Sequence, residues 1–128
     1  MLRVAIVEDE QKVADEMAAF FARYGAETDT EFQVIKFSNA VNFFSGYQAG
    51  FDIICMDIEM PHMNGMEAAR KLREIDSQVV LIFVTNLAQY AIDGYEVDAM
   101  SYMLKPTKYA TFRFVIKKAM ERCKKTEK

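Results

Sequence analysis

One short apolar run constrains the fold more than any other stretch of this chain. Residues Ile53 to Met56 are all apolar, with β-branched side chains among them, which is typical of a strand buried on both faces. The run ends on Asp57, and Pro61 stops the segment shortly afterwards. Open α/β sheets place their chemistry at the carboxyl ends of central parallel strands. Asp57 is therefore either a functional acid or an ordinary turn aspartate.

The rest of the chain alternates between strand and helix patterns. Runs rich in β-branched and aromatic residues predict five strands, over about 2–7, 31–37, 51–57, 79–84 and 99–104. Apolar residues at helical spacing predict five helices, over about 11–24, 39–47, 64–74, 87–95 and 107–123. Gly25 is expected to end the first helix. This order predicts an α/β fold: a flavodoxin-like (βα)5 doubly wound parallel sheet of five strands in the order 2-1-3-4-5.

Size and composition exclude several classes of protein. The chain of 128 residues fits one domain, and no apolar run approaches the roughly 20 residues that a membrane helix needs. The first residues are too acidic for a signal peptide. Cys55 and Cys123 do not form a disulfide framework, which favours reduced thiols in a cytosolic protein. His62 is the sole histidine, so a His-rich metal site is excluded, and we expect it in an exposed loop.

Basic residues gather at the end of the chain. Residues 105–128 hold nine Lys or Arg and two Asp or Glu, whereas residues 1–104 hold seven and seventeen. Such a tail either contacts nucleic acid or forms a solvated helix face that runs into a linker, and we favour the second interpretation. In the same segment Phe114 falls opposite the apolar stripe of the last helix, so we expect it to be exposed or covered by a partner.

Polar side chains follow four of the predicted strands at the points where these strands end. Glu8 and Asp9 follow the first strand, Asp57 the third, Thr85 the fourth and Lys105 the fifth. Three carboxylates at one edge would repel one another unless a hard divalent cation such as Mg²⁺ lies among them. A hydroxyl and a lysine suit the oxygens of a phosphoryl group. Each residue alone is ordinary, but together they indicate phosphoryl transfer to a carboxylate nucleophile.

These residues lie in four motifs that resemble the receiver domain of two-component response regulators. The motifs are Val7–Glu10, Met56–Gly65, Val84–Thr85 and Leu104–Pro106. The segment Tyr90–Pro106 is similar in particular to the receivers that precede LytTR-type DNA-binding domains. The resemblance implies a receiver domain over 1–122, with 123–128 starting a linker to a missing C-terminal output domain.

The resemblance also implies a role for each acid. Asp57 would be the phosphoacceptor and would take its phosphoryl group from a sensor histidine kinase. Asp9, Asp57 and the backbone carbonyl of Glu59 would bind Mg²⁺, or Mn²⁺ as an alternative, and Glu8 would reach the metal through water.

The same family pattern assigns a switch. Thr85 and Lys105 would hold the phosphoryl oxygens, and Tyr102 would turn inward when Thr85 moves toward them. The Lys105–Pro106 bond would be cis. The chain would dimerise through its fourth helix, fifth strand and fifth helix, and would reach DNA only through the missing domain. It would be cytoplasmic and would touch no membrane. Its only catalysis would be its own phosphorylation and a slow autodephosphorylation.

Two residues depart from the family pattern. Asn86 stands where receivers usually have Ala, Gly or Ser, and Glu59 adds a charge close to the acids. Both are expected to modulate access to Asp57 and so the lifetime of its phosphoryl group. Two alternatives stay open: a receiver-like interaction module that works without phosphorylation, and an aspartyl-phosphate hydrolase. Nucleotide or flavin binding is disfavoured, because the chain has no G-x-G-x-x-G motif or P-loop.

Overall fold

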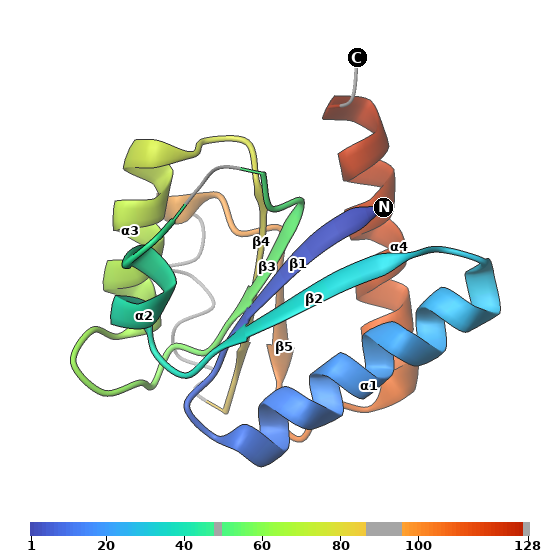
Figure 1. Ribbon diagram of the computed structural model, residues 1–128, viewed down its shortest axis with the longest axis horizontal. Helices are drawn as coiled ribbons and strands as arrows, with labels where there is room; N and C mark the ends of the chain where they lie inside the picture. Colours follow the sequence, from blue (N-terminus) through green and yellow to red (C-terminus); the bar gives the residue numbers. More distant parts are fainter. Residues whose placement is uncertain (48–49, 87–95, 127–128) are drawn as a thin grey trace.

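A five-stranded parallel sheet forms the centre of the molecule. The computed structural model describes residues 1–47, 50–86 and 96–126, with side chains described up to residue 124. Its strands are β1 Leu2–Val7, β2 Phe32–Phe37, β3 Ile53–Met56, β4 Val80–Thr85 and β5 Ser101–Leu104. All neighbours pair in parallel, in the order β2-β1-β3-β4-β5 (Figure 1). The predicted fold class is therefore confirmed, and each strand lies within two residues of its predicted bounds.

Helices cover both faces of this sheet. They are α1 Gln11–Thr28, α2 Ala40–Phe44, α3 Gly65–Ile75 and α4 Tyr109–Thr126. Helices α1 and α4 lie on one face, and α2 and α3 lie on the other (Figure 1). The predicted helix over 87–95 lies outside the described residues. In the described part of the chain, no helix is both long enough and apolar enough to cross a membrane.

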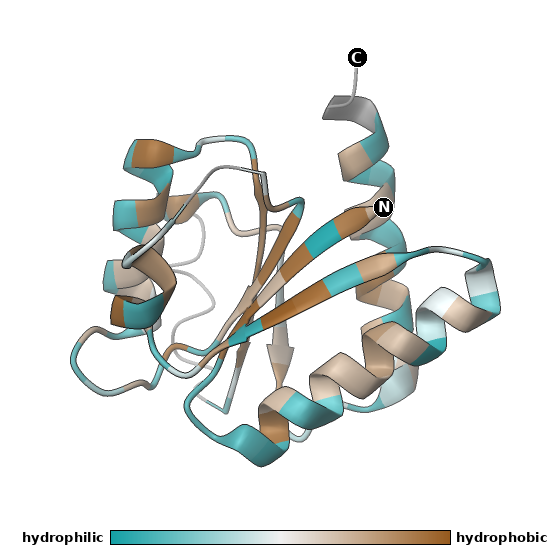
Figure 2. Cartoon of the chain, in the orientation of Figure 1, coloured by the Kyte–Doolittle hydropathy of each residue, from teal (hydrophilic) through white to brown (hydrophobic). Residues whose placement is uncertain are grey.

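The sheet divides the core into two apolar clusters. Successive residues of a strand point to opposite faces, so Ile53 and Cys55 pack with α1 and α4, whereas Ile54 and Met56 pack with α2 and α3. Figure 2 shows the strands mostly in the brown of apolar residues, while the helices mix brown and teal. All residues of β3 and β4 are buried, as the two apolar runs predict. Burial raises the pKa of the Cys55 thiol to about 12.

Helix α1 does not end at Gly25, so that prediction was wrong. The helix continues to Thr28, and Asp29 caps it in the left-handed conformation, donating its backbone N–H to the carbonyl of Gly25. A Cβ at Gly25 would lie 2.6 Å from the carbonyl oxygen of Thr30. The glycine is therefore explained by the close return of the chain into β2 and not by a helix stop.

The other helix bounds differ less from expectation. Asn39 caps α2, as one of the two predicted caps, with its side chain accepting from the backbone N–H of Asn42 at 2.8 Å. The last helix is shifted to Tyr109–Thr126 from the predicted 107–123. On this helix Phe114 is 62% exposed, which confirms the prediction, and the ammonium of Lys118 lies 4.4 Å from its ring centroid.

A tight contact fixes the connection between β3 and α3. Asn64 and Glu67 form a reciprocal capping box that starts α3. The N–H of Gly65 donates to the carbonyl of Ile58 at 2.7 Å, so the helix start lies directly against the residues that follow β3. A Cβ on Gly65 would lie 2.3 Å from the carbonyl oxygen of Asp57. Only glycine leaves room for this approach.

We therefore expect Gly65→Ala to lower the free energy of unfolding by about 1–3 kcal/mol, because the added methyl group must push the backbone apart. Gly46→Ala is the control, since a Cβ there meets nothing within 4 Å and should change stability by less than about 0.5 kcal/mol. Urea unfolding followed by circular dichroism measures both. Equal stability of the two variants would contradict the close contact.

Candidate functional site

The carboxyl ends of β1 and β3 bring three acids together. The sheet hydrogen bonds continue past both strands: the N–H of Glu8 donates to Phe37 at 2.9 Å, and that of Asp57 donates to Val7 at 3.0 Å. These bonds fix the backbone at the base of each acid. Carboxylate oxygens of Glu8, Asp9 and Asp57 all lie within 4.8 Å of one another. Glu8 and Asp57 are buried, while Asp9 is exposed.

Lys105 reaches the same cluster from the end of β5. Its Nζ lies 2.7 Å from Oε1 of Glu8 and 3.1 Å from Oδ2 of Asp57. Its backbone N–H donates to the carbonyl of Thr85 at 2.9 Å, which extends the β4–β5 ladder by one residue. The peptide bond to Pro106 is cis. The lysine thus bridges the two buried acids.

Burial and charge change the titration of this group of side chains. Burial raises the pKa of Glu8 to about 7, and the charge of Asp57 adds to the effect, while the hydrogen bond from Lys105 opposes it. For Lys105, burial alone would lower the pKa, but the hydrogen bond with Glu8 and the charge of Asp57 outweigh burial and raise it. One ammonium therefore faces three carboxylates, and negative charge remains in excess.

This donor set fits a hard divalent cation. The three acids offer only oxygen ligands, and one of them is exposed, so a metal ion could keep bound water on that side. Oxygen ligands with open positions suit Mg²⁺ better than metals that prefer nitrogen or sulfur. Glu59 is exposed, and its N–H lies 3.3 Å from Oδ1 of Asp57, so its backbone runs beside the acid cluster.

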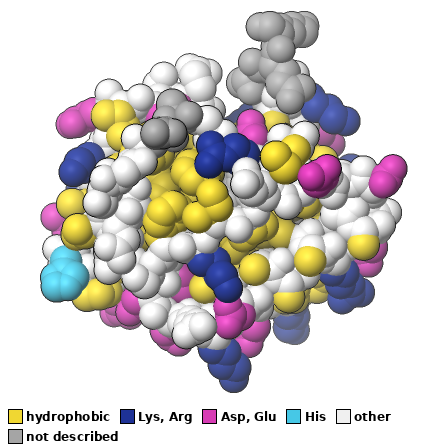
Figure 3. Space-filling view, in the orientation of Figure 1, with side chains coloured by type: hydrophobic (Ala, Val, Ile, Leu, Met, Phe, Trp, Pro, Cys, Tyr) yellow, Lys and Arg dark blue, Asp and Glu magenta, His cyan; other side chains and the backbone are white. Residues whose placement is uncertain are grey.

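The remaining predicted site residues lie around this cluster. Thr85 is fully buried at the carboxyl end of β4, next to β3 in the sheet, and Asn86 after it is exposed. Tyr102 is half-buried on β5 and pairs with Phe83 of β4. His62 has a φ of 72°, is exposed and is not part of the acid cluster. Figure 3 shows a histidine side chain, in cyan, at the surface.

Sequence reasoning missed one feature of the site. It assigned Lys105 to the phosphoryl oxygens, whereas the structure also pairs this lysine with Glu8 at the shorter of its two distances. The sequence did contain a signal, because three acids and one lysine were predicted at the same edge of the sheet. What it lacked was the side-chain geometry that decides which acid lies nearest.

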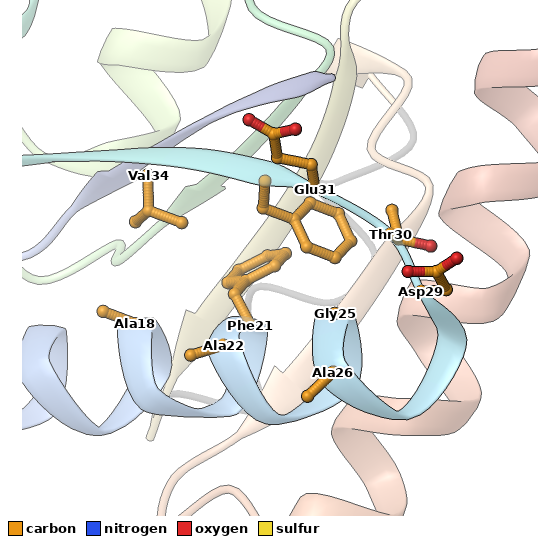
Figure 4. Close-up of a pocket in the computed structure, with 10 residues that line it drawn as sticks. Ala18, Phe21, Ala22, Gly25, Ala26, Asp29, Thr30, Glu31 and Val34 are labelled. Atoms are coloured by element: carbon orange, nitrogen blue, oxygen red, sulfur yellow. The ribbon is translucent and has the colours of Figure 1, made fainter.

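Hollows beside the acids give access from solvent. One of about 390 Å³ is lined by Glu8 and Asp9, and another of about 310 Å³ is lined by Asn86 and Lys105. A hollow of about 630 Å³ lies between α1 and β2 (Figure 4). Its lining consists mainly of small and apolar side chains and includes none of the three clustered acids, so its volume does not mark the site.

The sequence is similar to a known protein family and to several of its members. The sequence model of the response regulator receiver domain matches residues 4–117. The sensory transduction protein LytT of Bacillus subtilis is 32% identical over 107 residues, which are 83% of this chain and 43% of that protein. An uncharacterized response regulatory protein of Yersinia pestis is 37% identical over 107 residues, with the same coverage. The chain thus spans less than half the length of these curated relatives.

Solved structures show the same fold. A CheY-like receiver domain protein of Methanospirillum hungatei has a TM-score of 0.85 at 21% identity, and the match covers 98% of both chains. The response regulatory domain of mrkE from Klebsiella pneumoniae has a TM-score of 0.83 at 21% identity, covering 98% of this chain and all of that one. With the family match across most of the sequence, these findings identify the chain as a member of the response regulator receiver domain family.

Proposed function

We propose that Asp57 accepts a phosphoryl group from a phosphohistidine of a sensor histidine kinase, and that the chain then changes conformation to control an output. The observation that carries this proposal is the position of the Asp57 carboxylate, which is buried, lies 3.1 Å from the Lys105 ammonium and has two further acids beside it. A carboxylate held in this way is an available nucleophile, because the contact with Lys105 fixes its orientation.

The chemical step follows from these groups. A carboxylate oxygen of Asp57 attacks phosphorus, the P–N bond to the donor histidine breaks, and the electron pair leaves with the imidazole. Lys105 transfers its contact from the Asp57 carboxylate to a phosphoryl oxygen and offsets the added negative charge. Asp9, Asp57 and the carbonyl of Glu59 would bind Mg²⁺, or Mn²⁺ in its place, with Glu8 acting through water. The bound metal would neutralise charge on the transferring group.

Switching would begin at β4 and β5. In our proposal the buried Thr85 hydroxyl donates to a phosphoryl oxygen, and the ring of Tyr102 moves inward behind it. The helix predicted over 87–95, together with β5 and the last helix α4, would form the dimerisation face. The exposed apolar side chains of Leu104 on β5 and Phe114 on α4 support an association surface there.

The wider assignment rests on the relatives. Because they are longer than this chain and include sensory transduction proteins named LytT, we propose that 123–128 lead into an output domain. DNA contact and transcriptional control would belong to that domain. The receiver itself would act in the cytoplasm, and its catalysis would be limited to its own phosphorylation and slow autodephosphorylation.

Acetyl phosphate with Mg²⁺ should add one phosphoryl group to the protein, as measured by intact mass. The adduct should be absent in Asp57→Ala and absent when a chelator removes the metal. Continuous release of phosphate at enzyme-like rates would instead indicate an aspartyl-phosphate hydrolase. No adduct from acetyl phosphate or from a matched kinase would indicate an interaction module that works without phosphorylation.

Metal binding should depend on the clustered acids and not on acidity in general. Asp9→Asn removes one member of the cluster, so we expect the Mg²⁺ dissociation constant to rise on the order of 10-fold or more. Glu10→Gln is the matched control, because Glu10 is the neighbouring exposed acid outside the cluster. Calorimetry at a pH above the raised pKa of Glu8 measures both, and equal losses would contradict the assignment.

The two departures from the family pattern should affect how long Asp57 stays phosphorylated. Asn86 lines the hollow beside Lys105, and the backbone of Glu59 lies beside Asp57, so both are placed to affect the approach of water. We expect Asn86→Ala or Glu59→Ala, or both, to change the dephosphorylation rate of protein labelled with acetyl phosphate. Unchanged rates in both variants would exclude a role in access.

A further inference from the structure

Arg73 of α3 binds two segments of backbone at once. Its Nε donates to the carbonyl of Val97 at 2.7 Å, and its Nη2 donates to that of Asp98 at 3.0 Å. Its Nη1 donates to the carbonyls of Val79 at 2.8 Å and Asp76 at 3.3 Å. The first pair lies just before β5, and the second pair lies in the turn from α3 to β4. One half-buried guanidinium thus joins both turns.

The geometry of these contacts requires arginine. Guanidinium presents five N–H donors in a rigid plane, so it can reach four carbonyls on different sides. The ammonium of lysine has three donors at one point and cannot span both segments. The turn it holds also has a constrained backbone, since Asp98 adopts a φ of 51° and Val97 is only 2% exposed.

The other side of the contact is itself firmly held. Asp76 ends α3, and its Oδ1 accepts from the backbone N–H groups of Gln78 at 3.0 Å and Val79 at 3.1 Å. Its Oδ2 accepts from the hydroxyl of Tyr47 at 3.1 Å. The turn from α3 to β4 therefore gives Arg73 a fixed base from which to hold the residues before β5.

Strand β5 needs such an anchor because it lies at the edge of the sheet. It has four residues, it pairs with β4 alone among the described strands, and Lys105 follows it directly. The ladder is extended by the N–H of Met100 donating to Leu81 at 2.8 Å and by that of Lys105 donating to Thr85 at 2.9 Å. The acids, in contrast, come from β1 and β3, which have neighbours on both sides.

We propose that Arg73 is a positioning residue for the phosphoryl site. It fixes the start of β5 at the amino ends of the strands, and so it sets where Lys105 lies relative to Asp57 at their carboxyl ends. The part of this inference that concerns phosphoryl chemistry rests on the proposed function. The part that concerns the anchoring of β5 stands on the hydrogen bonds alone.

Amide hydrogen exchange on the full chain tests the anchoring. In Arg73→Gln and Arg73→Lys we expect the amides of Met100 and Lys105 to exchange about 10-fold faster or more, while the Glu8 amide between β1 and β2 keeps its rate. The control is Arg70→Gln, which removes an exposed ion pair with Glu96 from the same helix and should change neither rate. A uniform increase over all amides, or no increase, would overturn the anchor.

A second measurement tests the consequence for the site. The three clustered acids do not belong to β5, and displacing Lys105 takes a positive charge away from them, so the Arg73 variants should bind Mg²⁺ no more than about twofold more weakly. Labelling of Asp57 by acetyl phosphate should slow severalfold, because Lys105 is displaced. Loss of both properties together, or of neither, would overturn the positioning role. If the unaltered protein takes no phosphoryl group, the proposed function fails, while the exchange experiment still decides whether Arg73 anchors β5.

Discussion

The structure depends on charge compensation at one edge of its sheet. Burying Glu8 and Asp57 side by side is unfavourable, and Lys105 offsets part of this cost by contacting both at 2.7 and 3.1 Å. Compensation is incomplete, because Asp9 adds a third carboxylate and the pKa of Glu8 rises. A site with surplus negative charge attracts cations, and a bound cation would prepare it for the anionic phosphoryl group that we propose. Stability and proposed function therefore make opposite demands on the same side chains.

The scaffold separates what is rigid from what is adjustable. Glu8 and Asp57 follow interior strands, and Gly65 lets α3 pack directly against the backbone of Asp57, the proposed phosphoacceptor. Lys105 follows the edge strand β5, which pairs with β4. Arg73 of α3 binds the backbone just before this strand. A metal ion bound here would therefore have ligands on interior strands, whereas Lys105, which we propose contacts the phosphoryl group, follows an edge strand. This division suits the conformational change that we propose, because the acids and Lys105 are carried by different strands.

The sequence allowed most of the fold to be predicted, because the runs at β3 and β4 are apolar on both faces and can hardly lie anywhere but inside a sheet. It also placed Glu8, Asp57 and Lys105 at one edge. The end of α1 could not be predicted, since the need for Gly25 arises from the carbonyl of Thr30, a tertiary contact. Nor could the contacts of Arg73, which join segments more than twenty residues apart.

The division of the core into two clusters has a consequence for how the molecule evolves and responds. Cys55 and Met56 are adjacent in sequence but pack with different helices. Neighbouring residues of one strand therefore contribute side chains to two separate apolar clusters, which the strand backbone connects. A substitution beneath α1 and α4 changes side-chain contacts in one cluster, and the side chains beneath α2 and α3 belong to the other. A structural change in one cluster can therefore reach the other through a shift of the strands, because each strand carries side chains of both clusters.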